Sequence, residues 1–503
     1  MTVDHDRDTI PAMEINDLTP AERRVWDAFP RGEGVDFREG PDEDASDGRD
    51  WGPERTVRAE VIAALLLSNP APRGQVPGIN VRGIRITGKL DLKYAAIEHP
   101  IRLRACWFER KPQLYGARVR ALVLTDSALP GLTASTLCVD ITLRLNCCRF
   151  TGPIRLTGAR ITGGLFLQGA VIRPGTLADE EGEPPLQLNH AEIGTDIIAD
   201  ELTLHGQLRI NGATIAGLIS LDRAKLINPG GIALHAETVS VGTDLRGHRL
   251  EADGMVNLTG ARIPGQLILT RARLANRDGV ALRASSCAIG EFWLRLCPPI
   301  EGIVNLRRSQ LDMLYAEPGV WPPVIRAEGL TYRVLHPHLP AEERLPALER
   351  EESGYLPYAY EQLAAAYRTV GDEAGARTVQ LAKLRRHRST LPPHSRLWGL
   401  LQDATVGYGF RPLRAAGWLA ALLLTGSIAY GLHPPRELKA GEAPEFNPVF
   451  YTIDLMLPIV GFGQEGAFAP NGWYQWLSYV LIVTGWVLAT TTAAGVSRSL
   501  QRQ

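Results

Sequence analysis

The sequence lacks the motifs that mark most enzyme active sites. No Gly-rich dinucleotide fingerprint follows a predicted strand, and P-loop, His-Glu-x-x-His and Gly-x-Ser-x-Gly motifs are absent. The six cysteines form no C-x-x-C pair and no Cys/His spacing of the zinc type, and the scattered histidines stand at no metal-ligand spacing. We therefore expect no catalytic residues, no metal site, no cofactor and no disulfide framework.

The chain also lacks an excess of charge of either sign. Its 54 Lys and Arg residues stand against 55 Asp and Glu residues, which leaves a formal net charge of -1. A balanced charge gives no general attraction for nucleic acid. The first residues are polar and acidic, without the basic and apolar regions of a secretory signal, so we expect the N-terminal part to stay in the cytoplasm.

Turn-forming residues are abundant. The 503 residues include 50 glycines and 35 prolines, which indicates many short, interrupted elements. Between Val81 and Leu311 an aliphatic residue is followed three positions later by a small one and two positions later by another aliphatic, as in Leu156/Ala159/Ile161 and Leu258/Ala261/Ile263. Copies recur about every 11 residues, so two short strands form a coil of about 22 to 24 residues. The pattern predicts an all-β, right-handed parallel β-helix of about ten coils over residues 80–317.

The same pattern assigns the cysteines and arginines to opposite sides of the strands. We expect Cys106 and Cys148 at the small inward position and Cys287 at the aliphatic one, as core residues; a redox pair of Cys147 and Cys148 is the alternative. Arginine dominates the outward positions, which favours an acidic partner over proton transfer, with a plain solubilising surface left equally open. These outward arginines are Arg102, Arg104, Arg155, Arg160, Arg209, Arg223, Arg262, Arg271, Arg273, Arg307 and Arg308.

The segments around the solenoid differ from it in composition. Residues 1–54 are acidic and expected to be mostly flexible apart from a short helix at 20–29, and 55–79 are a cap helix and linker. Residues 318–354 are a Pro-rich linker. Residues 355–412 hold two predicted helices, at 360–367 and 374–388, and a basic juxtamembrane segment. The two helices resemble a single tetratricopeptide-type hairpin, for which we expect the role of an adaptor.

The C-terminal residues 413–503 contain two long apolar stretches, from Ala415 to Leu432 and from Trp473 to about Val496. We expect a two-helix transmembrane anchor at the inner (plasma) membrane. Basic residues flank the pair while acidic ones fill the loop, so the positive-inside rule predicts that both termini and the solenoid are cytoplasmic. Four of the basic residues, Lys383, Arg385, Arg386 and Arg388, are candidates for contact with anionic lipid headgroups.

The loop between the spans resembles part of a two-transmembrane-helix potassium-channel pore. In that family a re-entrant helix precedes a filter whose carbonyls replace an ion's hydration shell, and Val460-Gly461-Phe462-Gly463 stands at the matching place. The sequence departs from the family at Pro458 and Ile459, where Thr or Ser is usual, and at Gln464, where Asp is usual. Val460, Gly461, Phe462 and Gly463 are the hypothetical pore filter.

Nearly the whole chain resembles a family of actinobacterial membrane-anchored β-helix proteins. The resemblance rests on Leu18-Thr-Pro-Ala-Glu-Arg-Arg-Val-Trp-Asp-Ala-Phe-Pro-Arg-Gly32, Arg55-Thr-Val-Arg-Ala-Glu-Val61, the solenoid, Tyr408-Gly-Phe-Arg-Pro-Leu-Arg414 and Leu455-Met-Leu-Pro-Ile-Val460. Members often carry the label "membrane-associated oxidoreductase", for which this sequence offers no chemistry. The pentapeptide-repeat family is a looser neighbour.

The sequence thus favours a membrane-tethered cytoplasmic β-solenoid that acts as a binding or scaffold module for a cytoplasmic protein partner, without evident catalysis. The first alternative is an oligomeric, ion-channel-like pore gated by the solenoid, which requires a homo-oligomer. The second is a membrane-associated oxidoreductase, which the resemblance alone implies.

Overall fold

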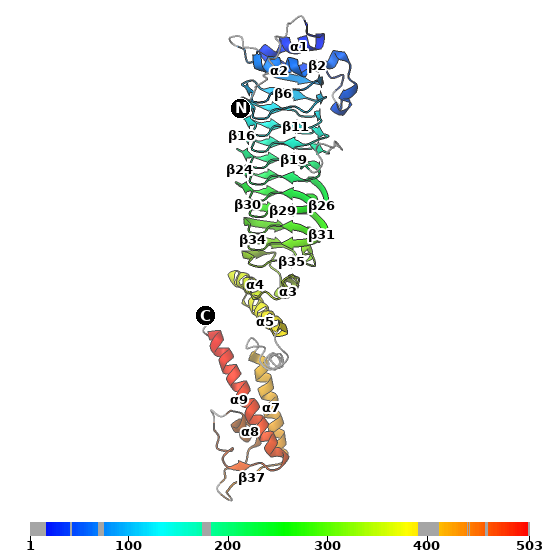
Figure 1. Cartoon of the computed structure of the whole chain (residues 1–503). Coiled ribbons are helices and arrows are strands. Elements are labelled where there is room, and N and C mark those ends of the chain that lie inside the picture. The colour runs from blue at the N-terminus through cyan, green and yellow to red at the C-terminus, as the bar shows by residue number, and fades with distance from the viewer. Residues whose placement is uncertain are drawn as a thin grey trace, which may run out of the picture. The chain divides into compact units, whose positions relative to one another are not determined.

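The computed structural model describes residues 17–40, 43–68, 75–173, 183–390, 412–439, 441, 443–457 and 461–500, with the backbone alone at 390, 412–416 and 489–500 (Figure 1). The chain divides into two compact units, Met1–Val370 and Gly371–Gln503, and each is described by itself.

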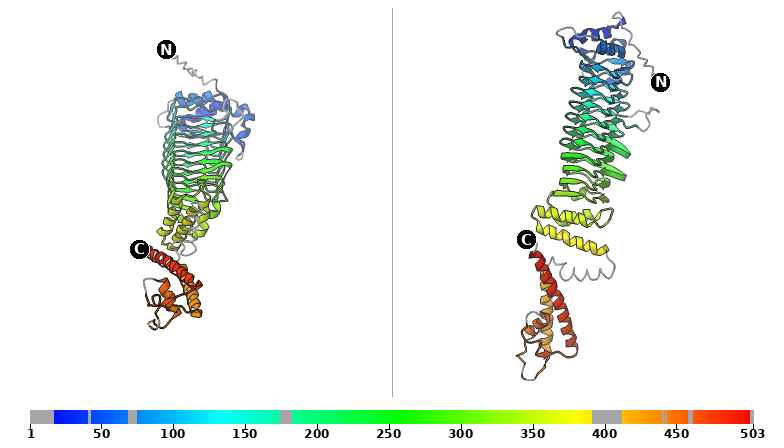
Figure 2. Two further views of the ribbon diagram at one scale, coloured as in Figure 1. Left: turned by 60° about the horizontal axis from the view of Figure 1, so that its bottom comes forward. Right: turned by 60° about the vertical axis from the view of Figure 1, so that its left-hand side comes forward.

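The N-terminal unit is a stack of coils in which the chain winds repeatedly through two sheets. Most strands have two residues, and each pairs in parallel with the equivalent strand of the neighbouring coils (Figure 1). The stack has about 11 turns, and Figure 2 shows it from two further directions. A single coil cannot bury its apolar side, so neighbouring coils share one continuous core. The predicted parallel β-helix is confirmed, and its right-handed sense stays a prediction.

The 20-stranded sheet, which we call sheet A, has two strands in most coils. Its members are β1 (Val35–Asp36), β3 (Ile79–Arg82), β5 (Ala96–Ile97), β6 (Ile101–Arg104), β8 (Arg118–Val119), β9 (Leu122–Val123), β12 (Cys138–Val139), β13 (Leu143–Arg144), β16 (Arg160–Ile161), β17 (Leu165–Phe166), β20 (Glu192–Ile193), β21 (Ile197–Ile198), β24 (Thr214–Ile215), β25 (Ile219–Ser220), β27 (Ser240–Val241), β28 (Leu245–Arg246), β30 (Arg262–Ile268), β32 (Ala288–Leu294), β34 (Gln310–Ala316) and β36 (Thr331–His336).

The 16-stranded sheet, which we call sheet B, forms the other side of the coils. Its members are β2 (Thr56–Arg58), β4 (Arg85–Thr87), β7 (Trp107–Phe108), β10 (Ala128–Leu129), β11 (Leu132–Thr133), β14 (Arg149–Phe150), β15 (Ile154–Arg155), β18 (Val171–Ile172), β19 (Leu186–Gln187), β22 (Thr203–His205), β23 (Leu208–Arg209), β26 (Lys225–His235), β29 (Glu251–Asn257), β31 (Arg273–Arg283), β33 (Glu301–Asn305) and β35 (Ile325–Arg326).

The register between coils agrees with the predicted period. Arg118 donates a hydrogen bond to Asp140 of the next coil, 22 residues later, and the Thr142 hydroxyl donates to the Gly164 carbonyl at the same separation. Longer coils arise where β26 and β31, of 11 residues each, carry irregular register against their neighbours. The extra residues are accommodated within sheet B, so the inward positions stay aligned along the stack.

Left-handed residues make the turns between strands. In the turn from Leu156 to Ala159 the Ala159 N–H donates to the Leu156 carbonyl at 3.0 Å, with Gly158 at φ +65°, as a type II turn requires. The Gly158 N–H then donates to the Asn189 carbonyl of the next coil at 2.8 Å, so the ladder of hydrogen bonds continues through the turns. Among the described residues, fourteen other than glycine hold φ between 49° and 59° at positions of this kind. The coil geometry therefore imposes a conformation that favours glycine on many residues that are not glycine.

Side chains alternate between core and surface as the repeat predicts. Ala159 and Ala261 have no exposed surface, and Cys106 and Cys148 are equally buried. One position was predicted wrongly. Cys287 takes the small position rather than the aliphatic one, because Ser286 is the left-handed residue of the turn Ala284–Cys287 and Ile289 follows as the aliphatic residue.

The N-terminal segment differs from the expectation of a mostly flexible region. From Asp17 on, its described residues form α1 (Pro20–Ala28), η2 (Phe29–Arg31), β1, η3 (Ala45–Asp50) and η4 (Pro53–Arg55), and α2 (Ala59–Ser68) follows β2. A capping box joins Thr19 to Glu22, and the buried Glu22 carboxylate accepts from Arg58 Nε at 2.8 Å. These elements close the first coil, where an open sheet edge and core would otherwise meet water.

The predicted Pro-rich linker is also wrong for much of its length, because the coils continue through β35 and β36. The short helix η6 (Pro318–Val320) precedes β35. After β36 come α3 (Ala341–Glu349) and α4 (Pro357–Thr369), and α4 matches the first predicted adaptor helix. Helix α4 packs on β36, where the Gln362 side chain donates to the Tyr332 carbonyl, and Tyr367 Oη donates to the Leu339 carbonyl at 2.6 Å. The C-terminal end of the core is thus capped by α4.

The C-terminal unit contains α5 (Glu373–Thr390), α7 (Pro412–Leu432), α8 (Pro448–Met456) and α9 (Trp473–Leu500), with the short antiparallel pair β37 (Arg436–Glu437) and β38 (Phe468–Ala469). Helix α8 packs tightly against α7 and α9. A Cβ atom at Gly426 would lie 2.4 Å from Thr452 Cγ2, and one at Gly485 would lie 2.5 Å from the Met456 carbonyl oxygen. Both glycines therefore permit contacts that no larger residue allows.

Helices α7 and α9 coincide with the two predicted spans. Within the part of the chain that the structure describes, no helix combines the length and the apolarity needed to cross a membrane. The transmembrane anchor stays a prediction.

Candidate functional site

Two neighbouring columns of polar side chains run along sheet B and the turn that follows it. We call them the polar strip. The first column contains Arg155, Gln187, Arg209, His235, Asn257, Arg283, Asn305 and Arg326, and the second contains Thr157, Asn189, Asn211, Glu237, Thr259, Ser285, Arg307 and Glu328. Each pair flanks one inward residue, as in Arg-Leu-Thr at 155–157 and Asn-Leu-Thr at 257–259. Because coils are about 4.8 Å apart, the strip presents hydrogen-bonding groups at a regular short spacing.

His235 lies at the centre of the hydrogen-bonded part of the strip, in contact with Gln207, Asn211 and Glu237. The Asn211 side-chain nitrogen lies 3.3 Å from His235 Nδ1, and Glu237 Oε1 lies 3.4 Å from His235 Nε2. Gln207 reaches the same ring at 3.4 Å, and its oxygen accepts from Arg209 Nη2 at 2.8 Å. Neighbouring coils are therefore joined by side-chain contacts in addition to the backbone ladder.

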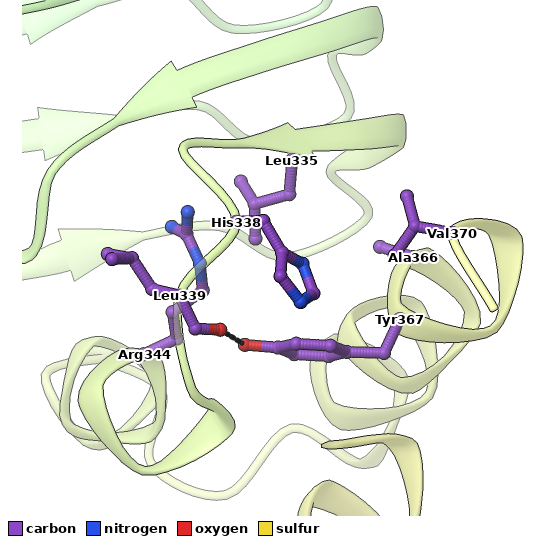
Figure 3. Close-up of a pocket in the computed structure, with 7 residues that line it drawn as sticks. All are labelled: Leu335, His338, Leu339, Arg344, Ala366, Tyr367 and Val370. Carbon is purple, nitrogen blue, oxygen red and sulfur yellow. Dashed lines mark hydrogen bonds between the residues drawn. The ribbon is translucent and has the colours of Figure 1, made fainter. Parts of the chain in front are cut away.

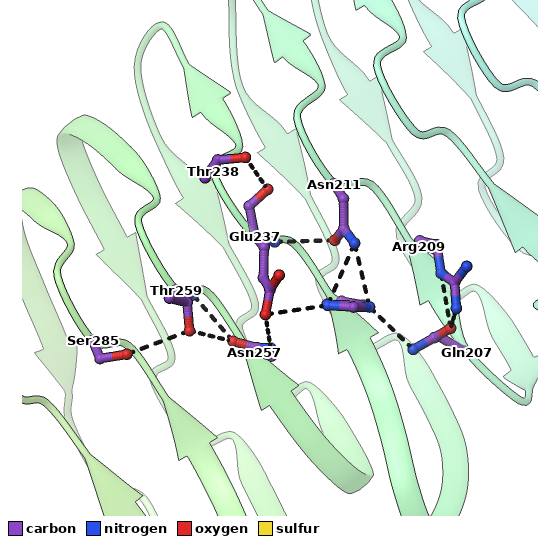
Figure 4. Close-up of polar contacts among 9 residues, drawn as sticks. Gln207, Arg209, Asn211, Glu237, Thr238, Asn257, Thr259 and Ser285 are labelled. Carbon is purple, nitrogen blue, oxygen red and sulfur yellow. Dashed lines mark hydrogen bonds and ion pairs between the residues drawn. The ribbon is translucent and has the colours of Figure 1, made fainter.

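The chain of contacts continues toward the C-terminal coils. Asn257 Nδ2 donates to Glu237 at 2.8 Å, and the Asn257 oxygen accepts from the Thr259 hydroxyl at 2.7 Å, which lies 3.3 Å from the Ser285 hydroxyl (Figure 4). Asn257 is 1% exposed although its side chain points away from the aliphatic core. A buried amide is stable only when its groups are bonded, so this part of the strip is held in one arrangement.

Charge is compensated at the ends of the strip and not in its middle. Arg155 pairs with Glu183, and Arg326 lies 2.5 Å from Glu352. Among the described residues, Arg209 hydrogen-bonds only to Gln207. Arg283 makes no ion pair with any of them, and its buried Nε has no hydrogen-bond partner among them. The middle of the strip can therefore donate charge-assisted hydrogen bonds to carboxylate, sulfate or phosphate groups.

The predicted outward arginines are all exposed or half-buried, so their orientation is as expected. Only Arg155, Arg209 and Arg307 belong to the polar strip. The sequence prediction did not include the amides and His235 that complete it. The signal was present as the polar residue on each side of an inward residue, at every coil of sheet B.

Burial suppresses thiolate formation at the inward cysteines. It raises the pKa of Cys106 to about 12 and that of Cys287 to about 11, and it raises the pKa of Cys148 further. The thiolate is the reactive form, so Cys148 is poorly suited to a redox pair with the exposed Cys147. The interpretation of these residues as small core hydrophobes is the one that their surroundings favour.

A small cavity lies in the C-terminal cap (Figure 3). Its volume is about 10 Å³, which admits about one water molecule and no substrate. It is lined by Leu335, His338, Leu339, Arg344, Ala366, Tyr367 and Val370. Arg344 is 7% exposed and donates to the Ala316 carbonyl at 3.1 Å and to the Pro337 carbonyl, so its role is to hold the cap on the last coils.

The structure describes three of the four hypothetical filter residues, Gly461, Phe462 and Gly463, in the loop after α8; Val460 lies outside the described residues. Asp454 is buried in α8, and its carboxylate accepts from the Phe462 N–H at 2.6 Å and from the Gln464 N–H at 2.8 Å. Gly463 has φ +78°. Sequence reasoning did not single out Asp454, although an acidic residue within an apolar stretch was a readable signal.

The four candidate headgroup contacts lie near the end of α5. Arg385 and Arg386 are exposed, and Lys383 and Arg388 are half-buried. They share the end of one helix, which concentrates positive charge on a short segment.

Comparison with known proteins gives no family: no family model matches the chain, and neither a curated protein nor a solved structure matches it.

Proposed function

We propose that this chain is a membrane-tethered cytoplasmic β-solenoid that binds an acidic partner along the polar strip, as a binding or scaffold module rather than an enzyme. The observation that supports this most is the pair of arginines in the middle of the strip, Arg209 and Arg283, which have no carboxylate partner among the described residues. The hydrogen-bonded side chains of the polar strip surround these arginines and hold them in place, so little conformational entropy is lost when a ligand binds.

The binding proposal is tested with poly-L-glutamate as an acidic probe and the full chain in mild detergent. Replacing both Arg209 and Arg283 by Gln should raise the dissociation constant at least about tenfold, because two charge-assisted hydrogen-bonding groups are removed. The matched control replaces Arg262 and Arg271, which are exposed on other faces, and should leave binding unchanged. Equal losses in the two double variants would mean that general charge, and not the polar strip, attracts the probe.

The tether is supported by apolar side chains on the surface of the C-terminal unit. Large apolar residues are exposed along α7 (Trp418, Leu424, Ile428, Leu432) and α9 (Trp473, Trp476, Tyr479, Val480, Val483, Trp486, Val487). Exposed apolar surface of this extent is unfavourable in water and suits the hydrocarbon of a bilayer. We propose that both helices span the inner membrane and that Lys383, Arg385, Arg386 and Arg388 contact anionic headgroups, at about 1 kcal/mol for each charge.

Topology is tested by single-cysteine labelling in a variant without Cys138 and Cys147. A cysteine at Glu442, between the spans, should react with an impermeant maleimide in intact cells. A cysteine at the exposed Thr214 of the solenoid should react only after the membrane is permeabilised. The reverse pattern would contradict a cytoplasmic solenoid.

A second candidate function, an oligomeric ion-channel-like pore, is favoured by one observation. Helix α8 packs against α7 and α9, and the Asp454 carboxylate accepts hydrogen bonds from backbone amides of the loop that follows. A re-entrant segment needs such bonds, because polar backbone groups cannot remain unbonded inside a membrane. Gly463→Ala should abolish ion flux in liposomes, because alanine is strained at φ +78°. Wild-type chain without any flux would remove this candidate.

The third candidate, an oxidoreductase, rests only on the label carried by the family that the sequence resembles. A flavin or nicotinamide that co-purifies with the chain would support it.

A further inference from the structure

One outer face of the solenoid is rich in half-exposed apolar side chains. It follows the second strand of sheet A through successive coils, and we call it the apolar face. Its half-exposed residues include Val123, Phe166, Ile198, Leu218, Ile268 and Tyr315. Arg144, Ser220 and Arg246 interrupt this row, and apolar side chains gathered in this way on a folded domain mark a contact surface.

Part of the charge on the apolar face is neutralised within the chain, since Arg246 lies 3.1 Å from Asp244. On the adjoining first strand of sheet A, Arg118 lies 3.2 Å from Asp140, and Arg160 lies 3.3 Å from Glu192 in the next coil. Arg144 on the apolar face, by contrast, has its guanidinium 4.3 Å from the centre of the Phe166 ring and makes no ion pair with a described residue.

Two carboxylates on the same face also lack a cationic partner in the described chain. Glu291 accepts from Trp293 Nε1 at 2.9 Å and from Gln266 at 2.6 Å, and Asp196 accepts from the Leu218 N–H at 2.9 Å. Both have no lysine or arginine within ion-pair distance among the residues that the structure describes. Among the described residues, the face therefore carries an unpaired cation, Arg144, toward its N-terminal end and an unpaired anion, Glu291, toward its C-terminal end, with Asp196 between them.

The order of residues along the face is complementary to itself when reversed. Starting from the coil of Ser220, Arg144 lies three coils before it, and Trp293, on the same strand as Glu291, lies three coils after it. Phe166 and Ile268 lie two coils on either side of Ser220. Reversal about Ser220 therefore brings Arg144 onto the coil of Glu291 and Phe166 onto Ile268, while Ile198 lies opposite Arg246.

From this symmetry we infer that the apolar face binds a second copy of the same chain, antiparallel, about a two-fold axis at Ser220. Arg144 of each copy meets Glu291 of the other, and Phe166 meets Ile268. A parallel arrangement would place Arg144 opposite Arg144 and Glu291 opposite Glu291, which like-charge repulsion disfavours.

The test measures the oligomeric state of the full chain in mild detergent by light scattering after size exclusion. Wild type should be a dimer, and Phe166→Asp should be a monomer. The matched control is Val171→Asp, which places the same charge at a half-exposed apolar position of sheet B in the same coil and should stay dimeric. A monomeric wild type, or a dimer that survives Phe166→Asp, would overturn the inference.

Charge reversal tests the antiparallel register. Arg144→Glu should raise the dimer dissociation constant at least about tenfold, since it places two carboxylates together. Adding Glu291→Arg in the same chain should restore dimerisation, because each contact then has its charges exchanged. Arg173→Glu, at an exposed position beside sheet B, is the control. Failure of the double reversal to restore the dimer would contradict this register, and none of these readouts depends on what the polar strip binds.

Discussion

Replacing Arg271 by glycine should stabilise this chain, whereas replacing Arg262 by glycine should destabilise it. Arg271 is exposed and holds φ +57° in a turn, whereas Arg262 is exposed in the extended strand β30. A left-handed conformation costs a residue with a Cβ atom about 1–2 kcal/mol. Glycine avoids that cost but loses about 0.5–1 kcal/mol of backbone entropy on folding. Arg271→Gly should therefore raise the unfolding free energy by about 0.5–1 kcal/mol, and Arg262→Gly should lower it by a similar amount.

Urea unfolding of the full chain in detergent, followed by far-UV circular dichroism, measures the shift in midpoint for each variant. The solenoid signal dominates such a measurement because nearly all strands belong to it. Gly158→Ala, at φ +65°, is the reciprocal control and should destabilise the chain. If Arg271→Gly lowered stability as much as Arg262→Gly, the left-handed turns would not be the strained element of the coil, and the reasoning would be refuted.

Three further predictions concern the core, the N-terminal cap and the loop after α8. Ala159→Arg should cost more than about 4 kcal/mol because it buries an unpaired charge, whereas the exposed Arg160→Ala should be nearly silent in the same melts. Burial alone would raise the pKa of Glu22, but hydrogen bonds from Arg58 and the backbone bring that pKa below its usual value. The stabilisation that ionised Glu22 gives to the folded state is therefore complete above about pH 4.3, and it is lost as the pH falls through the lowered pKa. Glu22→Gln should flatten the acid side of a plot of unfolding free energy against pH. An unchanged acid side would contradict this. Asp454→Asn should weaken the charge-assisted bonds to the loop amides and speed proteolysis there in detergent, and an unchanged cleavage rate would show that the carboxylate does not hold the loop.

The coil could be predicted from sequence because its inward positions permit few residue types. Close stacking leaves room only for a small residue after each turn, so Ala159, Ala261 and Cys148 recur with a fixed spacing. The shift at Cys287 shows where the pattern fails. Ala284 occupies the aliphatic position that is usually Leu. Because Ala284 is small, the sequence pattern placed the repeat two residues too early, at Leu282.

The caps could not be predicted in the same way, because they are not repeated. The last coil has Ala327 at an aliphatic position and prolines on either side, so composition indicated a linker where β35 and β36 continue the sheets. The N-terminal segment is acidic, yet Glu22 and Glu43 are bonded by Arg58 and Arg55. Acidic composition indicates flexibility only when the charges lack such partners.

The outer surface of a solenoid can be read coil by coil, and this separates structural charges from functional ones. Every outward column places its residues about 4.8 Å apart, so a charged side chain has its first partner in the coil above or below. Arg118 with Asp140 and Lys225 with Glu251 are neutralised in this way, and such exposed pairs contribute little beyond local order. Charges that break the rule, such as Arg283 in the polar strip and Arg144 on the apolar face, face outward without a neighbour of opposite sign among the described residues. The regular stack offers a position for an opposite charge in the neighbouring coil, but the sequence places none beside these two arginines. A binding partner is the simplest source of the missing charge, and the polar strip and the apolar face therefore point to two different partners.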